Sequence, residues 1–326
     1  MSLLFTKVFE KITNSDVKIA GGKGASLGEM THLLQGFGGQ AQGFVPPGFV
    51  VLASAFDAFM AETDINIELE NILHSVKPKD INSVEKASVK IRDIIHREKM
   101  PLNLQREVKA AYKQLSKGKK ILVAVRSSAT AEDSKVASWA GELETYLNVS
   151  EKNLTQSVMK CWSSLFTPRA IFYRFEKKLH RVPVSVAVVV QQMVQSEVSG
   201  IAFTTHPVTN DRDQIVIEAG FGLGEAIVSG QVTPDTYVIL KKNYSLLDIN
   251  VSEQRMAIVR AQKGTIEKKL SPKVGGKQKL TGKQIIELAK ICVLIERHYK
   301  HPQDIEWALY KKKFYITQSR PITTLH

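Results

Sequence analysis

The segment DIEWALYKKKFYITQSRPIT, residues 304–323, carries the alternation of polar and apolar residues that decides the fold of the C-terminal part of the chain. It predicts two strands, 304–310 and 314–320, joined by a loop of lysines. A three-residue hairpin loop, Lys311 to Lys313, places Tyr310 opposite Phe314. We therefore expect an antiparallel hairpin here.

The polar residues of this hairpin fall on one face. The same register pairs Glu306 with Gln318 and Asp304 with Arg320, because side chains alternate between the two faces of a strand. Opposed Cβ atoms lie about 4.5–5.5 Å apart, so oxygens of Glu306 and Gln318 could share one Mg²⁺ ion. The four residues also fit the solvent-exposed face of an ordinary hairpin, and the hairpin alone does not decide between these interpretations. The other face consists of the apolar residues Ile305, Trp307 and Leu309.

The composition is that of a globular protein. The chain has 326 residues, 43% of them hydrophobic, and a formal net charge of +13. Its lysines are spread along the chain without a nucleic-acid-binding module, which disfavours a polynucleotide partner and favours a small anionic substrate. No apolar run reaches the roughly 18 residues of a membrane span, and no signal peptide is evident, so we expect a cytoplasmic protein. The two cysteines, Cys161 and Cys292, predict neither a disulfide framework nor a structural zinc site.

The first half of the chain mixes helices with short strands. Apolar spacing predicts helices at 23–36, 82–97, 101–115, 151–163 and 167–179. Asn82 with Glu85 resembles a capping pair. The apolar run 121–125 predicts a strand, and the polar stretch 126–142 predicts a loop after it.

The second half is rich in strands. Runs of β-branched residues predict strands within 184–194, 199–205, 214–220, 235–242 and 256–270. One helix is expected at 282–299, capped by Thr281 with Gln284. We therefore expect an α+β protein with a mixed first lobe, 1–191, that contains a helical segment at about 53–116. A sheet-rich second lobe, 192–326, is expected to follow a hinge near residues 191–194.

Two glycine-rich segments could be taken for nucleotide-binding loops. IAGGKGASLGEM, residues 19–30, lacks the GxxxxGK[ST] pattern of a P-loop, and Lys23 by itself fits an ordinary surface lysine. The segment GFGLGEA, residues 220–226, does not complete the GxGxxG pattern, which disfavours a dinucleotide-binding fold.

Several short motifs nevertheless occur in the order of one known family. They are GGKGASLGEM with VPPGF, VRSSATAEDS with ASWAGELETYLNV, and DIEW with YITQSRPIT. Together they resemble the ATP-binding domain of phosphoenolpyruvate synthase and related dikinases, which have an ATP-grasp fold. The resemblance extends from about residue 10 to residue 324.

The resemblance implies ATP and Mg²⁺ as ligands and assigns roles by position. Lys23, Arg126 and Arg320 match residues that contact the nucleotide phosphates. Ser138 and Gly141 match a lid loop over the phosphates, and Gln191 and Met193 match a hinge at the adenine. Asp304 matches a nucleotide-binding residue, and Glu306 and Gln318 match the Mg²⁺ ligands. Forked arginines, a lysine and oxygen-bound Mg²⁺ suit phosphoryl transfer, although Arg126 alone also fits a salt bridge at a strand end.

The resemblance also implies a phosphotransferase that splits ATP to AMP and phosphate and passes a phosphoryl group to a histidine. In the family that histidine lies on a separate domain, and a further domain binds pyruvate. We expect neither domain within this chain, and we expect them in the same longer protein or in trans. His206 is expected to be a loop histidine. A rifamycin phosphotransferase and a non-catalytic nucleotide-binding module remain alternatives, and neither nucleic acid nor membrane is an expected partner.

Overall fold

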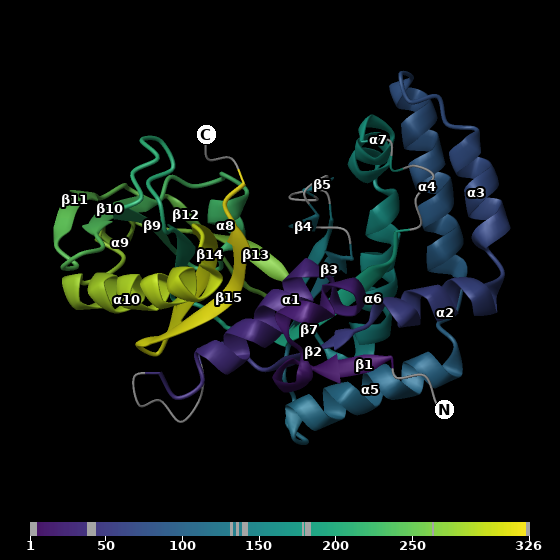
Figure 1. Cartoon of the computed structure of the whole chain (residues 1–326), viewed down its shortest axis with the longest axis horizontal. Coiled ribbons are helices and arrows are strands. Elements are labelled where there is room, and N and C mark those ends of the chain that lie inside the picture. The colour runs from purple at the N-terminus through teal and green to yellow at the C-terminus, as the bar shows by residue number, and fades with distance from the viewer. Residues whose placement is uncertain are drawn as a thin grey trace. The chain divides into compact units, whose positions relative to one another are not determined.

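The computed structural model describes residues 5–37, 44–130, 133–134, 137–138, 143–177, 179, 184–262 and 264–323, with only the backbone of 133–134 and 137–138. The chain divides into two compact units. The first unit contains Met1–Glu29 and Pro47–Met193, and the second unit contains Met30–Pro46 and Val194–His326. Figure 1 shows helices and strands in both units, so the expected α+β class is confirmed.

Most helices of the described chain belong to the first unit (Figure 1). They are α2 (Ala53–Thr63), α3 (Asn66–His74), α4 (Ile81–Arg97), α5 (Leu102–Ser116), α6 (Leu154–Ser163), α7 (Pro168–Glu176) and α1 (Val17–Leu33), of which the residues from Met30 on belong to the second unit. The amphipathic spacing that predicts α4 and α5 is confirmed, since residues such as Ile91, Ile94, Leu104 and Val108 are buried. The cap predicted for α4 is wrong. The N-cap residue is Asp80, whose carboxylate accepts a hydrogen bond from the N–H of Asn82 at 3.0 Å. Asn82 itself lies inside the first turn of the helix.

The strands of the first unit form an antiparallel sheet. They are β1 (Thr6–Val8), β2 (Gly48–Val51), β3 (Val123–Ala129), β6 (Thr145–Val149) and β7 (Val186–Gln192), with β4 (Asp133–Ser134) and β5 (Ala137–Ser138) as a separate short ribbon. Within the described residues the sheet order is β1-β2-β7-β3-β6. One face packs on α2 and α6, where Val125, Val188 and Trp162 share a core.

The loop predicted from residue 126 begins too early. Arg126 to Ala129 continue β3 and pair with β7 from Val189 to Val186. The polar residues of this stretch gave a loop signal, but ladder hydrogen bonds from β7 satisfy their backbone, so tertiary pairing overrides the local pattern.

The second unit is built on a larger antiparallel sheet. Its strands are β8 (Val198–Phe203), β9 (Gln214–Phe221), β10 (Asp235–Leu240), β11 (Leu246–Asn250), β14 (Gln303–Tyr310) and β15 (Lys313–Pro321). Within the described residues they follow the order β11-β10-β9-β8-β14-β15. Beside this sheet lie the ribbon β12 (Met256–Arg260) and β13 (Thr265–Lys269) and the short helices α8 (Glu225–Val228) and α9 (Pro272–Gly275).

The predicted long helix of the second unit is α10 (Gly282–Tyr299), which packs on β9 and β14. Its capping box is confirmed, because Thr281 N–H donates to Gln284 Oε1 at 2.9 Å and Gln284 N–H donates to Thr281 Oγ1 at 3.4 Å. The apolar stripe predicted for this helix is buried along its length, at Ile285, Leu288, Ala289, Cys292 and Ile295.

The terminal hairpin differs from the expectation at its turn. Tyr310 pairs with Lys313, so the loop has two residues rather than three, and both Lys311 and Lys312 have positive φ. Two such residues form the primed turn whose twist matches that of the flanking strands. This register places Phe314 opposite Leu309, on the buried face.

A β-bulge then restores the register that the sequence predicted. Trp307 pairs with Ile316, whereas Glu306 pairs with Gln318, so β15 carries one extra residue between them. Phe314 and Ile316 can therefore be buried with Trp307 while Gln318 still pairs with Glu306. The predicted pairs at the other end of the hairpin are confirmed, whereas the turn and the pairing from Trp307 to Tyr310 differ from the prediction by one residue.

Candidate functional site

The polar end of the β14–β15 hairpin brings two cross-strand pairs together. Arg320 donates from Nε to Asp304 Oδ2 at 2.9 Å, and its Nη2 lies 2.7 Å from the same oxygen. Gln318 Nε2 donates to Glu306 Oε1 at 3.1 Å. The sequence-predicted residues Asp304, Glu306, Gln318 and Arg320 thus form one cluster in the second unit.

Glu306 and Gln318 carry the hard oxygen atoms that Mg²⁺ prefers, and their side chains are adjacent. The atom of Gln318 that contacts Glu306 is Nε2, so a metal ion shared by both residues would require the Gln318 amide to rotate. Among the described residues, no group of three or more His, Cys, Asp and Glu side chains forms a metal site. Two protein ligands are nevertheless compatible with Mg²⁺, which keeps water and substrate phosphates in its remaining positions.

Glu218 is a further carboxylate of this sheet that the sequence analysis missed. Its strand neighbour in β8 is Ile201, and Ile201 pairs with Glu306 on its other side, so Glu218 and Glu306 lie in one row across the sheet. It is the one charged residue in the run QIVIEAGF, which is the signal that could have identified it. Strands in a sheet are about 4.8 Å apart, so the row places the Glu218 and Glu306 backbones about 10 Å apart.

Burial raises the pKa of two carboxylates of this sheet, Glu218 and Asp304. Desolvation raises the pKa of Glu218, and the Asp304 carboxylate raises it further. Desolvation also raises the pKa of Asp304, and Glu306 adds to that rise, while the Arg320 guanidinium opposes it. A cation bound beside Glu218 and Asp304 would stabilise their charged forms.

In the first unit, Lys23 lies on α1 just after a kink. Gly21 has φ 68° and ψ 171°, so α1 is two helical segments joined at this glycine. Lys23 is half-buried. The helix predicted at 23–36 therefore begins earlier, at Val17, and the kink at Gly21 sets the direction of the part of α1 that carries Lys23.

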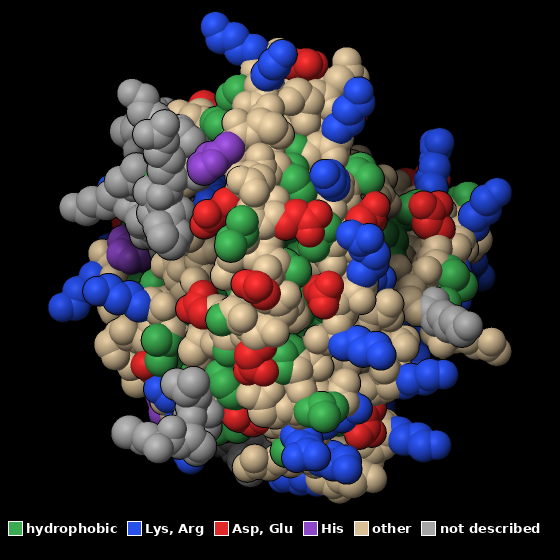
Figure 2. Space-filling view, turned by 90° about the vertical axis from the view of Figure 1, so that its right-hand side faces the viewer, with side chains coloured by type: hydrophobic (Ala, Val, Ile, Leu, Met, Phe, Trp, Pro, Cys, Tyr) green, Lys and Arg blue, Asp and Glu red, His purple; other side chains and the backbone are tan. Residues whose placement is uncertain are grey.

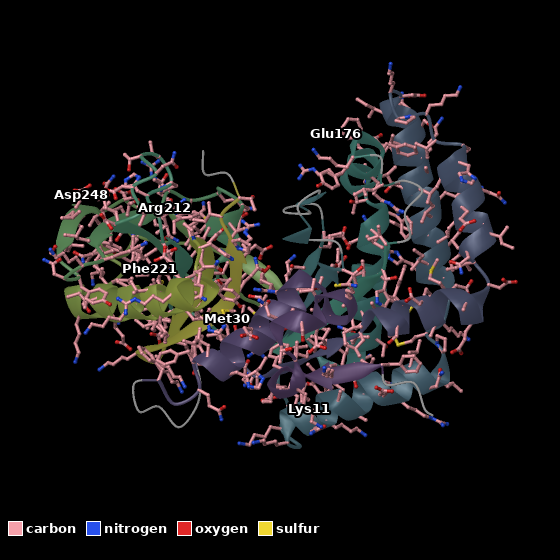
Figure 3. The ribbon with its side chains drawn as sticks, viewed as in Figure 1. Lys11, Met30, Glu176, Arg212, Phe221 and Asp248 are labelled. Atoms are coloured by element: carbon pink, nitrogen blue, oxygen red, sulfur yellow. The ribbon has the colours of Figure 1, made fainter. Side chains whose placement is uncertain are left out.

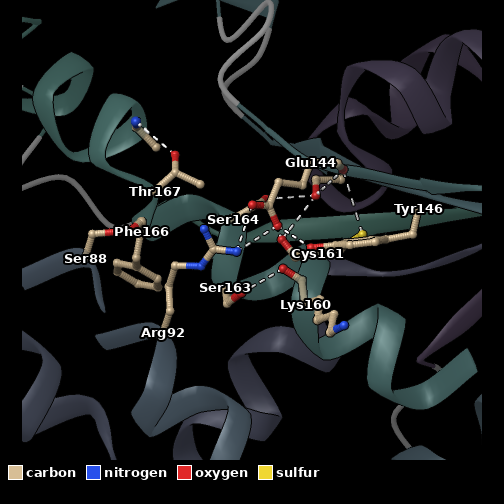
Figure 4. A network of polar contacts seen from close by, with 12 residues as sticks. Ser88, Arg92, Glu144, Tyr146, Lys160, Cys161, Ser163, Ser164, Phe166 and Thr167 are labelled. Carbon is tan, nitrogen blue, oxygen red and sulfur yellow. Dashed lines mark hydrogen bonds and ion pairs between the residues drawn. The ribbon is translucent and has the colours of Figure 1, made fainter. Parts of the chain in front are cut away.

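Arg126 lies in the middle of the first sheet. It pairs with Val189 of β7 and with Thr145 of β6, and its side chain is half-buried. Beside it, Arg92 Nη2 donates to both carboxylate oxygens of Glu144, at 2.7 and 2.9 Å (Figure 4). Tyr146 OH also donates to Glu144, and burial raises the pKa of that phenol. This network, which sequence reasoning did not identify, holds the start of β6 against α4.

The predicted adenine hinge is a paired strand end. Gln191 pairs with Gly48 and Ala124 and is buried, and Met193 N–H donates to Leu122 C=O at 2.9 Å. A nucleobase at this segment would therefore have to use groups other than the Met193 N–H. Of the predicted lid loop, the structure describes the backbone of Ser138, which pairs with Asp133, and Gly141 lies outside the described residues.

His206 caps a turn. Its Nδ1 accepts the N–H groups of Val208 and Thr209, at 3.2 and 3.3 Å. An imidazole nitrogen that accepts backbone hydrogen bonds in this way does the work of an Asn or Asp side chain in an Asx turn. This contact gives His206 a structural role in its loop.

One face of the molecule carries both acidic and basic side chains (Figure 2). On the face drawn in Figure 2, Asp and Glu side chains lie among the Lys and Arg side chains. None of the helices within the described residues combines the length and apolar character needed to cross a membrane.

Comparison with known proteins now places the chain. Residues 17–326 match the family described as the pyruvate phosphate dikinase AMP/ATP-binding domain. The chain belongs to this family. It therefore contains the kind of domain that the sequence motifs predict, and the expected relationship to phosphoenolpyruvate synthase is confirmed by individual relatives.

A protein of Methanocaldococcus jannaschii named "Probable phosphoenolpyruvate synthase" is 44% identical over 99% of this chain and 27% of its own length. The "Phosphoenolpyruvate synthase" of Pyrococcus furiosus is 39% identical over 100% of this chain and 44% of its own length. The "Rifampicin phosphotransferase" of Bacillus cereus is 39% identical over 99% of this chain and 36% of its own length. The chain thus spans less than half the length of these relatives.

A solved structure, D-alanyl-alanine synthetase A from Vibrio cholerae, aligns with 72% of this chain and 54% of its own, at 12% identity and a TM-score of 0.30. A likeness of this size does not identify the fold, so the family assignment rests on the sequence relatives.

Proposed function

We propose that this chain is the ATP-binding domain of a phosphoenolpyruvate synthase-like phosphotransferase and that it binds ATP with Mg²⁺. The observation that carries the proposal is the hairpin cluster, where Glu306 and Gln318 converge beside the Asp304–Arg320 pair in a chain of this family. This combination of metal ligands and a guanidinium group suits the phosphates of a nucleoside triphosphate.

Each proposed role follows from chemistry at a named atom. The carboxylate of Glu306 and the amide oxygen of Gln318 hold the Mg²⁺ ion, which neutralises charge on the phosphate oxygens when it is bound. Asp304 holds the Arg320 guanidinium by two contacts, so Arg320 presents its fork in a fixed direction. The carboxylate of Glu218 contributes further negative charge near the proposed metal site.

The first unit is proposed to supply the other phosphate contacts. Lys23 is a mobile point charge and Arg126 a forked donor, and both suit phosphate oxygens. We further propose that Ser138 and Gly141 cover the phosphates and that Gln191 and Met193 contact the adenine. These side chains bind and orient the nucleotide, and orientation with charge neutralisation is most of what phosphoryl transfer requires.

The proposed reaction splits ATP to AMP and phosphate and passes a phosphoryl group to a histidine of a further domain, in the same protein or in trans. The greater length of the relatives supports a further domain. Within this chain His206 is a poor acceptor, because its Nδ1 is held by the backbone of its own turn. We propose pyruvate as the final acceptor, with water receiving the remaining phosphate, and a cytoplasmic location.

Isothermal titration with a non-hydrolysable ATP analogue and Mg²⁺ tests the metal site. We expect Glu306→Ala/Gln318→Ala to weaken binding by at least about tenfold, since loss of even indirect metal contacts costs about 10- to 100-fold. A matched control is Gln262→Ala/Glu267→Ala, which removes the same two residue types at exposed positions of the second unit. Unchanged binding in the Glu306 and Gln318 variant would refute the metal assignment.

The similarity to a rifampicin phosphotransferase supports a second candidate, in which the same ATP-binding domain serves another acceptor. Supplying a histidine domain in trans and measuring AMP release with pyruvate or with a rifamycin separates the two. A chain that binds ATP but releases no AMP with any histidine domain would instead be a non-catalytic nucleotide-binding module.

A further inference from the structure

The kink in α1 is bridged by a side chain from a distant strand. In an unbroken α-helix the N–H of Gly24 would donate to the C=O of Ala20, four residues earlier. Here Gly24 N–H donates to Ser128 Oγ at 3.3 Å, and Ser128 Oγ donates to Ala20 C=O at 3.0 Å. The hydroxyl of Ser128 is therefore inserted into the helical hydrogen bond, which a hydroxyl can do because it donates and accepts at once.

The helix and the strand are also in direct contact at this point. A Cβ atom on Gly21 would lie 2.2 Å from Ser128 Oγ and 2.4 Å from Ser128 O. Gly21 has positive φ, and Ala20, Gly24 and Ser128 are buried like it. Both the conformation and the lack of space require glycine, so the kink lies directly against Ser128 of β3.

This contact connects the two cations that the proposed function assigns to the ATP phosphates in the first unit. Lys23 lies between Gly21 and Gly24, inside the bridged turn. Arg126 lies two residues before Ser128 on β3, so the two side chains leave the same face of the strand. The Ser128 hydroxyl therefore links the turn that carries Lys23 directly to the strand that carries Arg126.

We propose that Ser128 is a positioning residue for ATP, which acts by holding the turn that carries Lys23 at a fixed distance from Arg126. The proposal rests on the proposed function, since it assumes that Lys23 contacts a nucleotide phosphate. Without the hydroxyl, Gly24 N–H and Ala20 C=O lose the group that bridges them. The turn at Gly21 then opens more readily, and Lys23 is no longer held in one position.

The neighbouring serine provides a matched control. Ser127 is as buried as Ser128 but faces the other side of β3. Its hydroxyl contacts Cys161 O and Glu144 O, each at 3.1 Å, and Ser164 Oγ at 2.9 Å. Ser127→Ala thus removes a buried, hydrogen-bonded hydroxyl from the same strand without touching α1.

A double-mutant cycle on ATP affinity tests the role. We expect Ser128→Ala to raise the Kd for Mg²⁺ with ATP about tenfold in the otherwise wild-type chain, equivalent to ~1.4 kcal/mol, and less than about twofold when Lys23→Met is also present. Ser128→Cys, which keeps a weaker donor of similar size, should fall between. Ser127→Ala should change the Kd less than about twofold in both backgrounds. Equal effects of Ser128→Ala with and without Lys23 would overturn the proposal.

Hydrogen exchange of the ATP-free chain provides a second readout. Ser128→Ala should speed exchange of the amides at residues 22–24, and Ser127→Ala should not, while peptides of α4 stay protected if the variants are folded. Unchanged exchange at residues 22–24 would also overturn the proposal. If the wild-type chain itself binds no ATP, the proposed function fails and the positioning role fails with it, even where the exchange result shows that the bridge exists.

Discussion

Lys279 and Asp235 form a fully buried ion pair in the second unit, and replacing Lys279 by Ala should destabilise that unit strongly. The ammonium lies 2.7 Å from Asp235 Oδ1 and also contacts Ser252 O and Gly275 O, so all of its N–H groups are satisfied. Its Nζ also lies 5.4 Å from the centre of the Phe221 ring, and Phe221 is labelled in Figure 3. Both side chains of the ion pair are 0% exposed.

The size of the stability loss follows from the hydrogen bonds that Asp235 keeps when Lys279 is replaced. Its carboxylate would still accept from Ser252 N–H at 3.0 Å, Tyr237 OH at 2.7 Å and the backbone N–H of residue 279 at 2.9 Å, but its charge would be buried without a counterion. Removing one partner of such a pair costs about 3–5 kcal/mol. With a urea dependence of about 2 kcal/mol/M, the unfolding midpoint of the second unit should fall by about 2 M.

Urea unfolding followed by hydrogen exchange and mass spectrometry measures each unit separately. Peptides from α10 and β14 report the second unit, and peptides from α4 and α6 report the first, whose midpoint should not change. Lys241→Ala is the control, because its ion pair with Glu296 has the same 2.7 Å distance but is partly exposed, and it should cost at most about 1 kcal/mol.

The double variant Asp235→Asn/Lys279→Met removes both charges and should lose less than half as much stability as Lys279→Ala, since no lone charge is left buried. A midpoint shift below about 0.5 M for Lys279→Ala, or a double variant as unstable as the single one, would refute the reasoning.

Three further predictions concern the candidate site. Burial and the Asp304 carboxylate raise the pKa of Glu218, so its contribution to folding stability is complete below the unfolded pKa and is lost as pH rises through the raised folded pKa. Glu218→Gln should therefore reduce the loss of second-unit stability between about pH 4 and pH 7, measured by urea titration. An unchanged pH profile of stability would contradict this. Lys23→Met should raise the Kd for Mg²⁺ with ATP by at least about tenfold in calorimetry, whereas Lys18→Met, at an exposed position of the same helix, should change it less than about twofold. Gly21→Ala should destabilise the first unit by at least about 2 kcal/mol, because the added Cβ would collide with Ser128. Gly118 also has positive φ but has open space around it, so Gly118→Ala should cost about 1 kcal/mol. Similar losses for the two variants would show that contact with Ser128 is unimportant.

Short-range patterns explain why much of the fold could be predicted. The capping box at Thr281, the apolar stripe of α10 and the alternation in β14 each depend on residues close together in the chain. These patterns are sufficient to locate the helix and the terminal hairpin, and to pair Asp304 with Arg320 and Glu306 with Gln318.

The turn of that hairpin shows where local reasoning failed. Three consecutive lysines predicted a three-residue loop, but burying Phe314 beside Trp307 requires a two-residue turn and a later bulge. The ring centroids of these aromatic residues lie 5.6 Å apart. The preference for burying Phe314 belongs to the core of the second unit, and the loop sequence does not contain it.

The sequence by itself determined the family, the α+β class and the two polar pairs of the hairpin, because motifs and periodicity are local properties of the chain. Only the tertiary structure decided that Glu218 joins the acidic row, since β8 lies between β9 and β14. It also decided that Ser128 completes the helical turn at Ala20, a contact between residues 108 positions apart. Contacts of that separation depend on strand order and on which backbone groups are left to be satisfied after the chain has packed.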